Sequence, residues 1–101
     1  MARQDVWVTA RFVVQSGMGE EMKPHLNLLV RAVRQEHGCL FDDCVQDDKD
    51  PNAFTFIEHW ATQADFDAHV AGAPAKKWSD ATGHMVAVPV DIVYHKSIWP
   101  E

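Results

Sequence analysis

Apolar and polar side chains alternate with a period of two along residues 6–14, a pattern that predicts a β-strand. Val8 and Phe12 fall on one side of this segment, and Trp7 and Val13 fall on the other. Because both sides are largely apolar, the strand is predicted to be covered on both of its faces.

A helical period follows the first strand. Apolar residues recur at spacings of three and four between Met22 and Val33, which predicts a long amphipathic helix over about residues 20–36. Pro24 falls in the first turns of this helix, where a missing N–H group costs least. Gly38 then ends the helix, because glycine is the usual residue just past a helix terminus.

Three more extended segments are predicted. Two of them, Cys39–Gln46 and Ala53–Trp60, are separated by residues 47–52, which are rich in the turn-forming residues Asp, Asn and Pro. These two segments are therefore expected to pair as an antiparallel hairpin. The third, over residues 86–98, alternates again and predicts a last strand.

Two short helices are predicted between the hairpin and the last strand. Thr62 precedes Asp65 by three residues, which is a weaker form of the capping box and predicts a helix start. The helix that it opens carries Phe66 and His69 on one face. A second short helix is expected over residues 74–81.

The order β-α-β-β-α-β predicts an α+β, ferredoxin-like domain over residues 1–101, with a four-stranded antiparallel sheet and its helices on one face. The other face of this sheet would expose apolar side chains from every strand. Such an area is too large for a soluble monomer, so we expect a homodimer that packs sheet against sheet.

Composition and net charge exclude some classes of partner. Apolar residues make up 47% of the chain and charged residues 24%, as in soluble globular proteins. The net charge of -6 argues against nucleic acid or an anionic membrane as a partner. No apolar run approaches the roughly 20 residues that span a bilayer, and no signal peptide follows Arg3, so we expect a cytoplasmic protein.

Cys39 and Cys44, about 16 Å apart along one strand, are expected to be reduced thiols.

No cofactor is expected from the motifs. The six histidines and two cysteines show no HxxxH, HxH or CxxC spacing that would indicate zinc, and no Gly-rich phosphate loop is present. Asp48, Asp50 and Asn52 imitate the start of a calcium loop, but Ala53 and His59 occupy the positions that need Gly and Glu. We therefore interpret residues 47–52 as a solvated hairpin loop.

Several segments, among them residues 8–14, 36–40, 50–54 and 58–69, resemble the antibiotic biosynthesis monooxygenase family. The resemblance covers nearly the whole chain. It implies a dimeric α+β barrel of two ferredoxin-like subunits. It also implies oxidation of a quinol or polyphenol by molecular oxygen without metal or flavin. Trp60 and His69 stand where family members have their Glu-x-Trp and Ala-His elements.

The chain also departs from some branches of that family. Pro74 is followed by Ala75, where many members have a second histidine. Phe56 and Phe66 occupy the places of an Asn and a Tyr in actinorhodin-type monooxygenases. Val8 stands where the haem-degrading branch needs an Asn, so haem is not expected.

His69 is the candidate catalytic base. Oxygenation without a cofactor needs a substrate anion that can give an electron to oxygen, and hence a base and a dry pocket. Imidazole suits this role because its ordinary pKa of about 6.5 lies near working pH. His69 shares a helix face with Phe66 and should face the sheet. The alternative is a histidine that is only packed and hydrogen-bonded beneath the helix.

The candidate pocket is aromatic. Trp60, Phe66, Trp78 and Tyr94 would wall a site for a flat substrate, unless they belong to the core instead. Glu58 shares a sheet face with Trp60, whereas His59 points the other way. A buried Glu58 would need a partner such as Arg11 or Lys96.

These observations predict a cofactor-independent monooxygenase that oxidises a small quinol or polyphenol. His69 and Trp60 are the predicted catalytic residues, and Phe66, Trp78, Tyr94 and Glu58 are predicted to bind substrate. Two alternatives stay open. One is an isomerase or degrading enzyme for a small carbonyl metabolite, and the other is a small-molecule-binding stress-response protein without turnover.

Overall fold

The computed structural model describes residues 3–100, and within them it confirms the predicted order of elements. The strands are β1 (Val6–Val14), β2 (Cys39–Gln46), β3 (Ala53–Trp60) and β4 (Val86–His95). The helices are α1 (Gly19–Val33), α2 (Gln63–Val70) and α3 (Ala73–Thr82), and a 3₁₀ turn, Gly83–Met85, leads into β4. The chain therefore has the α+β, ferredoxin-like fold that its periodicity predicted.

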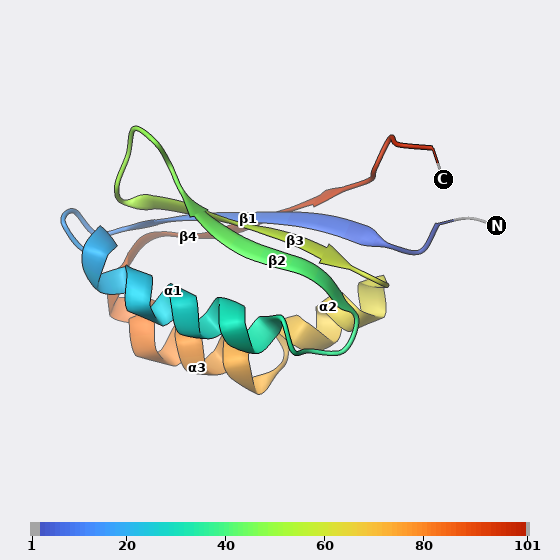
Figure 1. The fold of residues 1–101 in the computed structure, drawn as a ribbon. Helices are drawn as coiled ribbons and strands as arrows, with labels where there is room; N and C mark the ends of the chain where they lie inside the picture. The colour runs from blue at the N-terminus through green and yellow to red at the C-terminus, as the bar shows by residue number, and fades with distance from the viewer. Residues whose placement is uncertain (1–2, 101) are drawn as a thin grey trace.

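The described strands form one antiparallel sheet in the order β2-β3-β1-β4, and all three helices lie on the same face of it (Figure 1). Pairing stops at β2 on one side and at β4 on the other. The sheet is thus open in a single chain, so any barrel would need a second subunit.

The strand register decides which side chains meet the helices. Residues directly opposite one another in antiparallel strands share a face. Val8 lies opposite Glu58 on the face that the helices cover, which we call the inner face. Trp7 lies opposite His59 on the outer face, so His59 points away from Glu58 as predicted.

The core fills the space between the inner face and the helices. Phe12, Trp60, Met22 and Met85 are almost fully buried there, from β1, β3, α1 and the turn before β4. Burying each large apolar side chain contributes roughly 1.5–3 kcal/mol, so this layer provides much of the stability that holds the helices against the sheet.

Helix α1 ends at Val33, three residues before the predicted end at Glu36. The N–H groups of Gln35 and Glu36 donate to the carbonyls of Ala32 and Val33, so the chain tightens into a turn after the last buried residue of the helix. Gly38 follows with a φ of +80°, which a residue with a side chain rarely adopts. Glu36 therefore lies in a turn rather than in the helix.

Strand β4 ends at His95, so the prediction that it extends to Ile98 is wrong. His95 lies opposite Trp7, and β1 begins only one residue earlier, at Val6. Beyond His95 the chain has no neighbouring strand to bond, and Ile98 is fully exposed. The alternation of apolar residues in β4 does not indicate where the neighbouring strand begins.

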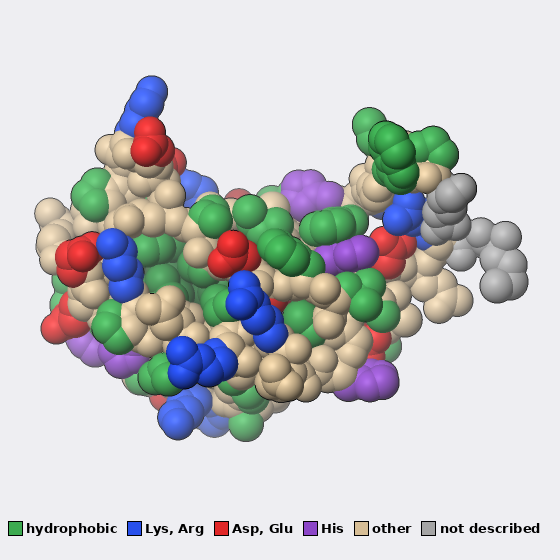
Figure 2. Space-filling view, viewed as in Figure 1, with side chains coloured by type: hydrophobic (Ala, Val, Ile, Leu, Met, Phe, Trp, Pro, Cys, Tyr) green, Lys and Arg blue, Asp and Glu red, His purple; other side chains and the backbone are tan. Residues whose placement is uncertain are grey.

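The outer face carries apolar side chains that no element of the chain covers. Trp7, Ile57, Phe41 and Val93 come from four different strands, and Phe41 and Val93 are more than 40% exposed. Figure 2 shows hydrophobic and histidine side chains in a hollow between the projecting hairpin and the C-terminal segment. Within residues 3–100, no helix is long and apolar enough to cross a bilayer.

Candidate active site

A cavity of about 430 Å³ lies between the inner face of the sheet and the helices. Its volume falls in the range of small-molecule sites. The helices and strands of residues 3–100 all contribute to its wall, in which apolar residues outnumber polar and charged ones. The lining residues include Asp42, Glu58, Phe66, His69, Trp78 and Ile92.

His69 lies in the last turn of α2. Thr62 caps that helix by accepting a hydrogen bond from the N–H of Asp65 at 3.1 Å, and this sets the rotation of the helix. The His69 side chain is nearly buried and stacks on Trp60 with ring centroids 4.9 Å apart. The predicted orientation of His69 towards the sheet is therefore confirmed.

Two carboxyl groups face the two nitrogens of that imidazole. Glu36 Oε2 lies 3.2 Å from His69 Nδ1. Glu58 Oε1 lies 3.7 Å from Nε2. With Nδ1–H donating to Glu36, Nε2 is left as the proton acceptor, because neutral imidazole carries one proton.

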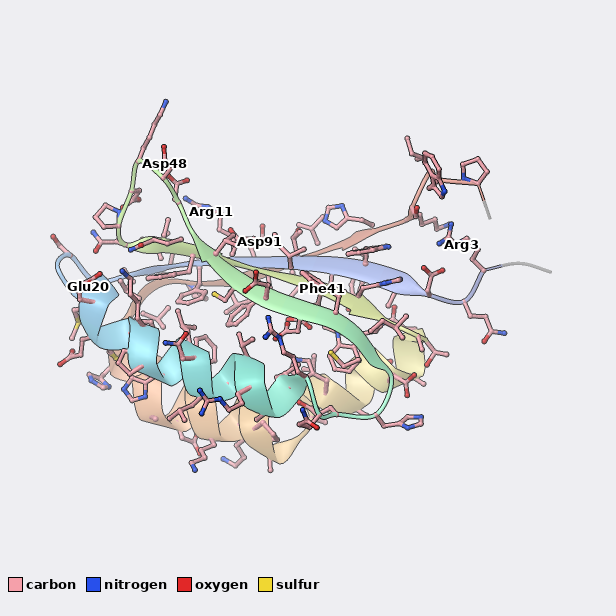
Figure 3. The ribbon with its side chains drawn as sticks, in the orientation of Figure 1. Arg3, Arg11, Glu20, Phe41, Asp48 and Asp91 are labelled. Carbon is pink, nitrogen blue, oxygen red and sulfur yellow. The ribbon has the colours of Figure 1, made fainter. Side chains whose placement is uncertain are left out.

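Glu58 is buried in the middle of β3, and its neighbours differ from those expected. Trp60 Nε1 donates a hydrogen bond to Glu58 Oε1 at 2.8 Å. The prediction that Arg11 or Lys96 is the partner of Glu58 is wrong. Arg11 lies opposite Asp91 on the outer face (Figure 3), and Lys96 lies beyond the end of β4. Burial raises the pKa of Glu58, against the opposing effects of the Trp60 hydrogen bond and the His69 charge.

Asp42 faces the same cavity from β2, directly opposite Glu58. It is 2% exposed. Burial, and then the charge of Glu58, raise the pKa of Asp42 to about 8, while the Arg34 guanidinium acts in the opposite direction. Burial therefore makes Asp42 bind its proton more tightly than an ordinary carboxyl group does.

A family model described as antibiotic biosynthesis monooxygenase matches residues 5–81. The chain belongs to the antibiotic biosynthesis monooxygenase family. The match covers β1 through nearly all of α3, and so it includes the His69 helix and both strands that carry the buried acids.

Solved structures with the same fold include proteins named for this monooxygenase family. A Nitrosomonas europaea protein named for the family superposes with a TM-score of 0.90 at 22% identity, covering 99% of this chain and 96% of its own. A Pseudomonas aeruginosa protein gives 0.86 at 25% identity, with 95% and 96% covered. Another structure named for the family gives 0.86 at 27% identity, with 92% and 98% covered. No curated protein matches the chain.

The structure brings together four of the six site residues predicted for this family member. Glu58, Phe66, His69 and Trp78 all line the cavity. Trp60 does not line it: it lies behind His69 and contacts both His69 and Glu58. Tyr94 is also outside the lining, on exposed β4, where its ring meets the edge of Phe66.

Two acidic residues near His69 in this monooxygenase-family chain, Glu36 and Asp42, were missed by sequence reasoning. Glu36 was assigned to the end of the helix, and periodicity gave no sign that it contacts His69, 33 residues later, from outside the cavity lining. Asp42 lies two residues before Cys44, so the two side chains point to the same face of the strand. This alternation shows that Asp42 faces the helices only once the register places it opposite Glu58. Within residues 3–100, no three His, Cys, Asp or Glu side chains are grouped to hold a metal ion.

Proposed function

We propose that this protein is a cofactor-independent monooxygenase that oxidises a small quinol or polyphenol with molecular oxygen. The observation that carries the proposal is His69, held by Glu36 at Nδ1 with Nε2 at the wall of a largely apolar cavity. A base fixed in this way, in a pocket of this size, is what removal of a phenolic proton requires. The family assignment supports a small-molecule monooxygenase fold.

The reaction proceeds through the substrate anion. His69 Nε2 accepts the proton of a phenolic hydroxyl, and the resulting anion gives electrons to dioxygen and forms a carbon–oxygen bond at a ring carbon. One oxygen atom stays on the ring, and the other leaves as water with two hydrogens from the substrate. A quinol and dioxygen thus become a hydroxyquinone and water, and the substrate supplies every electron.

The neighbouring groups favour this proton transfer. Glu36 beside Nδ1 stabilises the imidazolium that forms when Nε2 takes the proton. Trp60 stacks on the ring and limits its rotation. Phe66 and Ile92 add apolar surface to the cavity wall, which suits the flat ring of the substrate.

We expect the protein to consume one molecule of oxygen per molecule of a naphthalene-type quinol, faster than the quinol oxidises alone. An oxygen electrode measures this rate, with a protein-free blank as the control. Adding catalase at the end should return no oxygen, because the second oxygen atom leaves as water and not as hydrogen peroxide. Oxygen release on catalase addition, or no uptake above the blank with any quinol, would contradict the proposal.

An isomerase of small carbonyl compounds is the second candidate. The adjacent His69 Nε2 and Glu58 carboxyl, 3.7 Å apart, favour it because a proton could be removed by one and returned by the other. This reaction consumes no oxygen. Solvent deuterium appearing in a recovered carbonyl compound, with no oxygen uptake on any quinol, would favour it over the oxygenase.

A second copy of the chain is proposed to cover the outer face of the sheet. The apolar side chains there come from all four described strands and face solvent in the single chain. We expect sedimentation equilibrium at micromolar concentration to give twice the chain mass of 11.4 kDa. Trp7→Glu should shift the mass towards the monomer, because it places a charge among these groups.

Leu28→Glu is the matched control for that experiment. Leu28 is an exposed apolar residue of α1, on the opposite side of the molecule from the outer face. The same charge there should leave the dimer intact. A monomeric wild type, or equal association of the two variants, would contradict a dimer through the sheet.

A further inference from the structure

A second cavity, of about 660 Å³, lies between α1 and β2, and we call it the α1–β2 groove. It shares no lining residue with the cavity that contains His69. β2 is an edge strand, so no other described strand borders the groove beyond it. The groove is large enough for a small molecule, and the proposed oxidation does not use it.

The buried part of the groove wall is apolar. Leu26 of α1 and Phe54 of β3 are 4% and 3% exposed, and Val30 and Cys44 pack against the same core. Burial raises the pKa of Cys44 to about 12, so its thiol stays neutral at physiological pH. An uncharged wall of this kind suits the body of an organic molecule better than a bare inorganic ion.

The exposed part of the groove wall is cationic. Lys23, Arg31 and Arg34 line it from the α1 side, and Asp43 of β2 contributes one carboxylate. Three cations and one carboxylate give these lining residues a formal charge of +2, in a chain whose net charge is -6. Figure 2 shows Lys and Arg side chains over α1. The groove therefore has the opposite charge to the molecule as a whole, and it favours anions.

Helix geometry places two of these cations together. Arg31 and Arg34 are three residues apart, and Arg34 keeps helical backbone angles at the end of α1. Their side chains are therefore neighbours, with Cβ atoms about 5–6 Å apart. Lys23 lies about 12 Å earlier along the axis, and its ammonium already pairs with Glu20 at 2.6 Å. The two arginines thus form the cationic end of the groove.

The Arg34 guanidinium reaches from the end of α1 to β2. Its Nε donates to the backbone carbonyl of Asp42 at 2.8 Å. Its Nη2 lies 3.9 Å from Asp43 Oδ1, which is too far for a hydrogen bond, and that oxygen accepts from the N–H of Cys44 at 2.8 Å. One hydrogen bond therefore holds the guanidinium at the groove, while its terminal N–H groups donate none within residues 3–100.

The Arg31 side chain has neither a hydrogen bond nor an ion pair among the described residues. Two neighbouring cations on a helix repel each other, so the pair is slightly destabilising when nothing lies between them. An oxyanion bound by both arginines would remove this repulsion. The planar guanidinium group matches the paired oxygens of a carboxylate or a phosphate.

We propose that the α1–β2 groove binds an organic oxyanion, which is a carboxylate or a phosphate on an apolar body. The oxyanion accepts hydrogen bonds from Arg31 and Arg34, and the apolar body lies against Leu26, Val30 and Phe54. This site is separate from the cavity of the proposed oxidation, so the inference does not depend on that function. Neutral ring compounds and bare inorganic anions each lack one of the two features that the groove recognises.

The test follows the backbone amide signals of the ¹⁵N-labelled protein by NMR while four probes are added separately. 2-Naphthoate and 2-naphthyl phosphate carry an oxyanion on a naphthalene ring. 2-Naphthamide keeps the ring without the charge, and inorganic phosphate keeps the charge without the ring. We expect both naphthyl anions to shift the signals of residues 23–35 and 43–46. They should bind there roughly 10-fold more tightly than the other two probes.

The two naphthyl anions also distinguish the head group. Tighter binding of 2-naphthyl phosphate would assign an organic phosphate to the groove. Equal or tighter binding of 2-naphthoate would assign a carboxylate. Either result supports an oxyanion site, because both probes present oxygens to the same pair of arginines.

Arg31→Gln and Arg34→Gln each remove one cation and retain a polar side chain. Each should weaken both naphthyl anions roughly 5-fold, the effect of one exposed ion pair, and leave 2-naphthamide unchanged. Arg34→Gln also removes the hydrogen bond to Asp42, so thermal melts accompany the titrations. Arg31→Gln should melt as the wild type does, because its side chain has no partner within residues 3–100.

Lys77→Gln is the matched control. Lys77 is an exposed cation of α3 outside the groove lining, so its loss changes the net charge of the chain by the same amount. This variant should bind both naphthyl anions as the wild type does. A decrease equal to that of Arg31→Gln would show that net charge alone governs the affinity, and the inference would be overturned.

Three further results would also overturn the inference. The wild type could bind neither naphthyl anion, or the shifted signals could belong to α2 and not to the groove. 2-Naphthamide or inorganic phosphate could bind the groove as tightly as the naphthyl anions do. Arg31→Gln could retain the wild-type affinity. None of these measurements uses oxygen uptake, so failure of the proposed oxidation leaves the groove unaffected, and failure of the groove leaves the oxidation unaffected.

Discussion

Replacing His69 with alanine should lower kcat/KM for a quinol by roughly 10² to 10⁴-fold, the usual worth of a positioned general base. His69 Nε2 is the basic atom at the cavity wall, and Glu36 holds the ring through Nδ1. Removing the imidazole leaves Glu36 and Glu58 without that neighbour but keeps the core intact. The measurement is oxygen uptake against quinol concentration, with thermal melts alongside.

His37→Ala is the matched control, because His37 is an exposed histidine just before Gly38 whose imidazole lies outside the cavity lining. It should keep the wild-type rate. Glu36→Gln should fall between the wild type and His69→Ala, since it keeps a hydrogen-bond partner for Nδ1 but loses the charge that stabilises the imidazolium. Equal rates for the wild type and His69→Ala would remove His69 from the chemistry.

Trp60→Ala should lower the free energy of unfolding by roughly 3–5 kcal/mol and the activity with it. Trp60 is fully buried, meets the edge of Phe66 and stacks on His69. Its truncation opens a cavity in the core and also removes the N–H group that Glu58 accepts from. Urea unfolding followed by circular dichroism measures the change.

Trp60→Phe separates the two contributions. It retains a ring in the core but leaves the Glu58 carboxyl without its Trp60 partner, which costs about 1–3 kcal/mol. Trp99→Phe, in an exposed indole, is the control and should unfold as the wild type does. If Trp60→Ala unfolded at the same urea concentration as the wild type, the packing role argued for Trp60 would be refuted.

Local patterns were sufficient to predict the order of elements. Alternation over β1 and β3 is dictated by the two-residue repeat of a strand, and Thr62 with Asp65 marks the start of α2 through a contact three residues apart. Such signals lie within one turn or one strand, so neighbouring residues alone decide them. The inward position of His69 followed from the same short-range periodicity.

Contacts between distant residues needed the tertiary structure. Glu36 meets His69 because the chain turns before Gly38, and Asp42 meets Glu58 because β2 and β3 pair in one particular register. A one-residue change of register would point Asp42 to the other face. The length of β4 likewise depends on where β1 begins, and not on the side chains of β4 itself.

The sequence by itself therefore determined the fold class, the inward-facing histidine and two of the aromatic residues of the pocket, Phe66 and Trp78. The tertiary structure decided which acids surround that histidine, left Trp60 and Tyr94 outside the cavity wall, and placed Asp42 opposite Glu58. The physical reason is that periodicity reports which side of an element is buried. What an inward side chain contacts depends on how separate elements pack and on the register that pairs them.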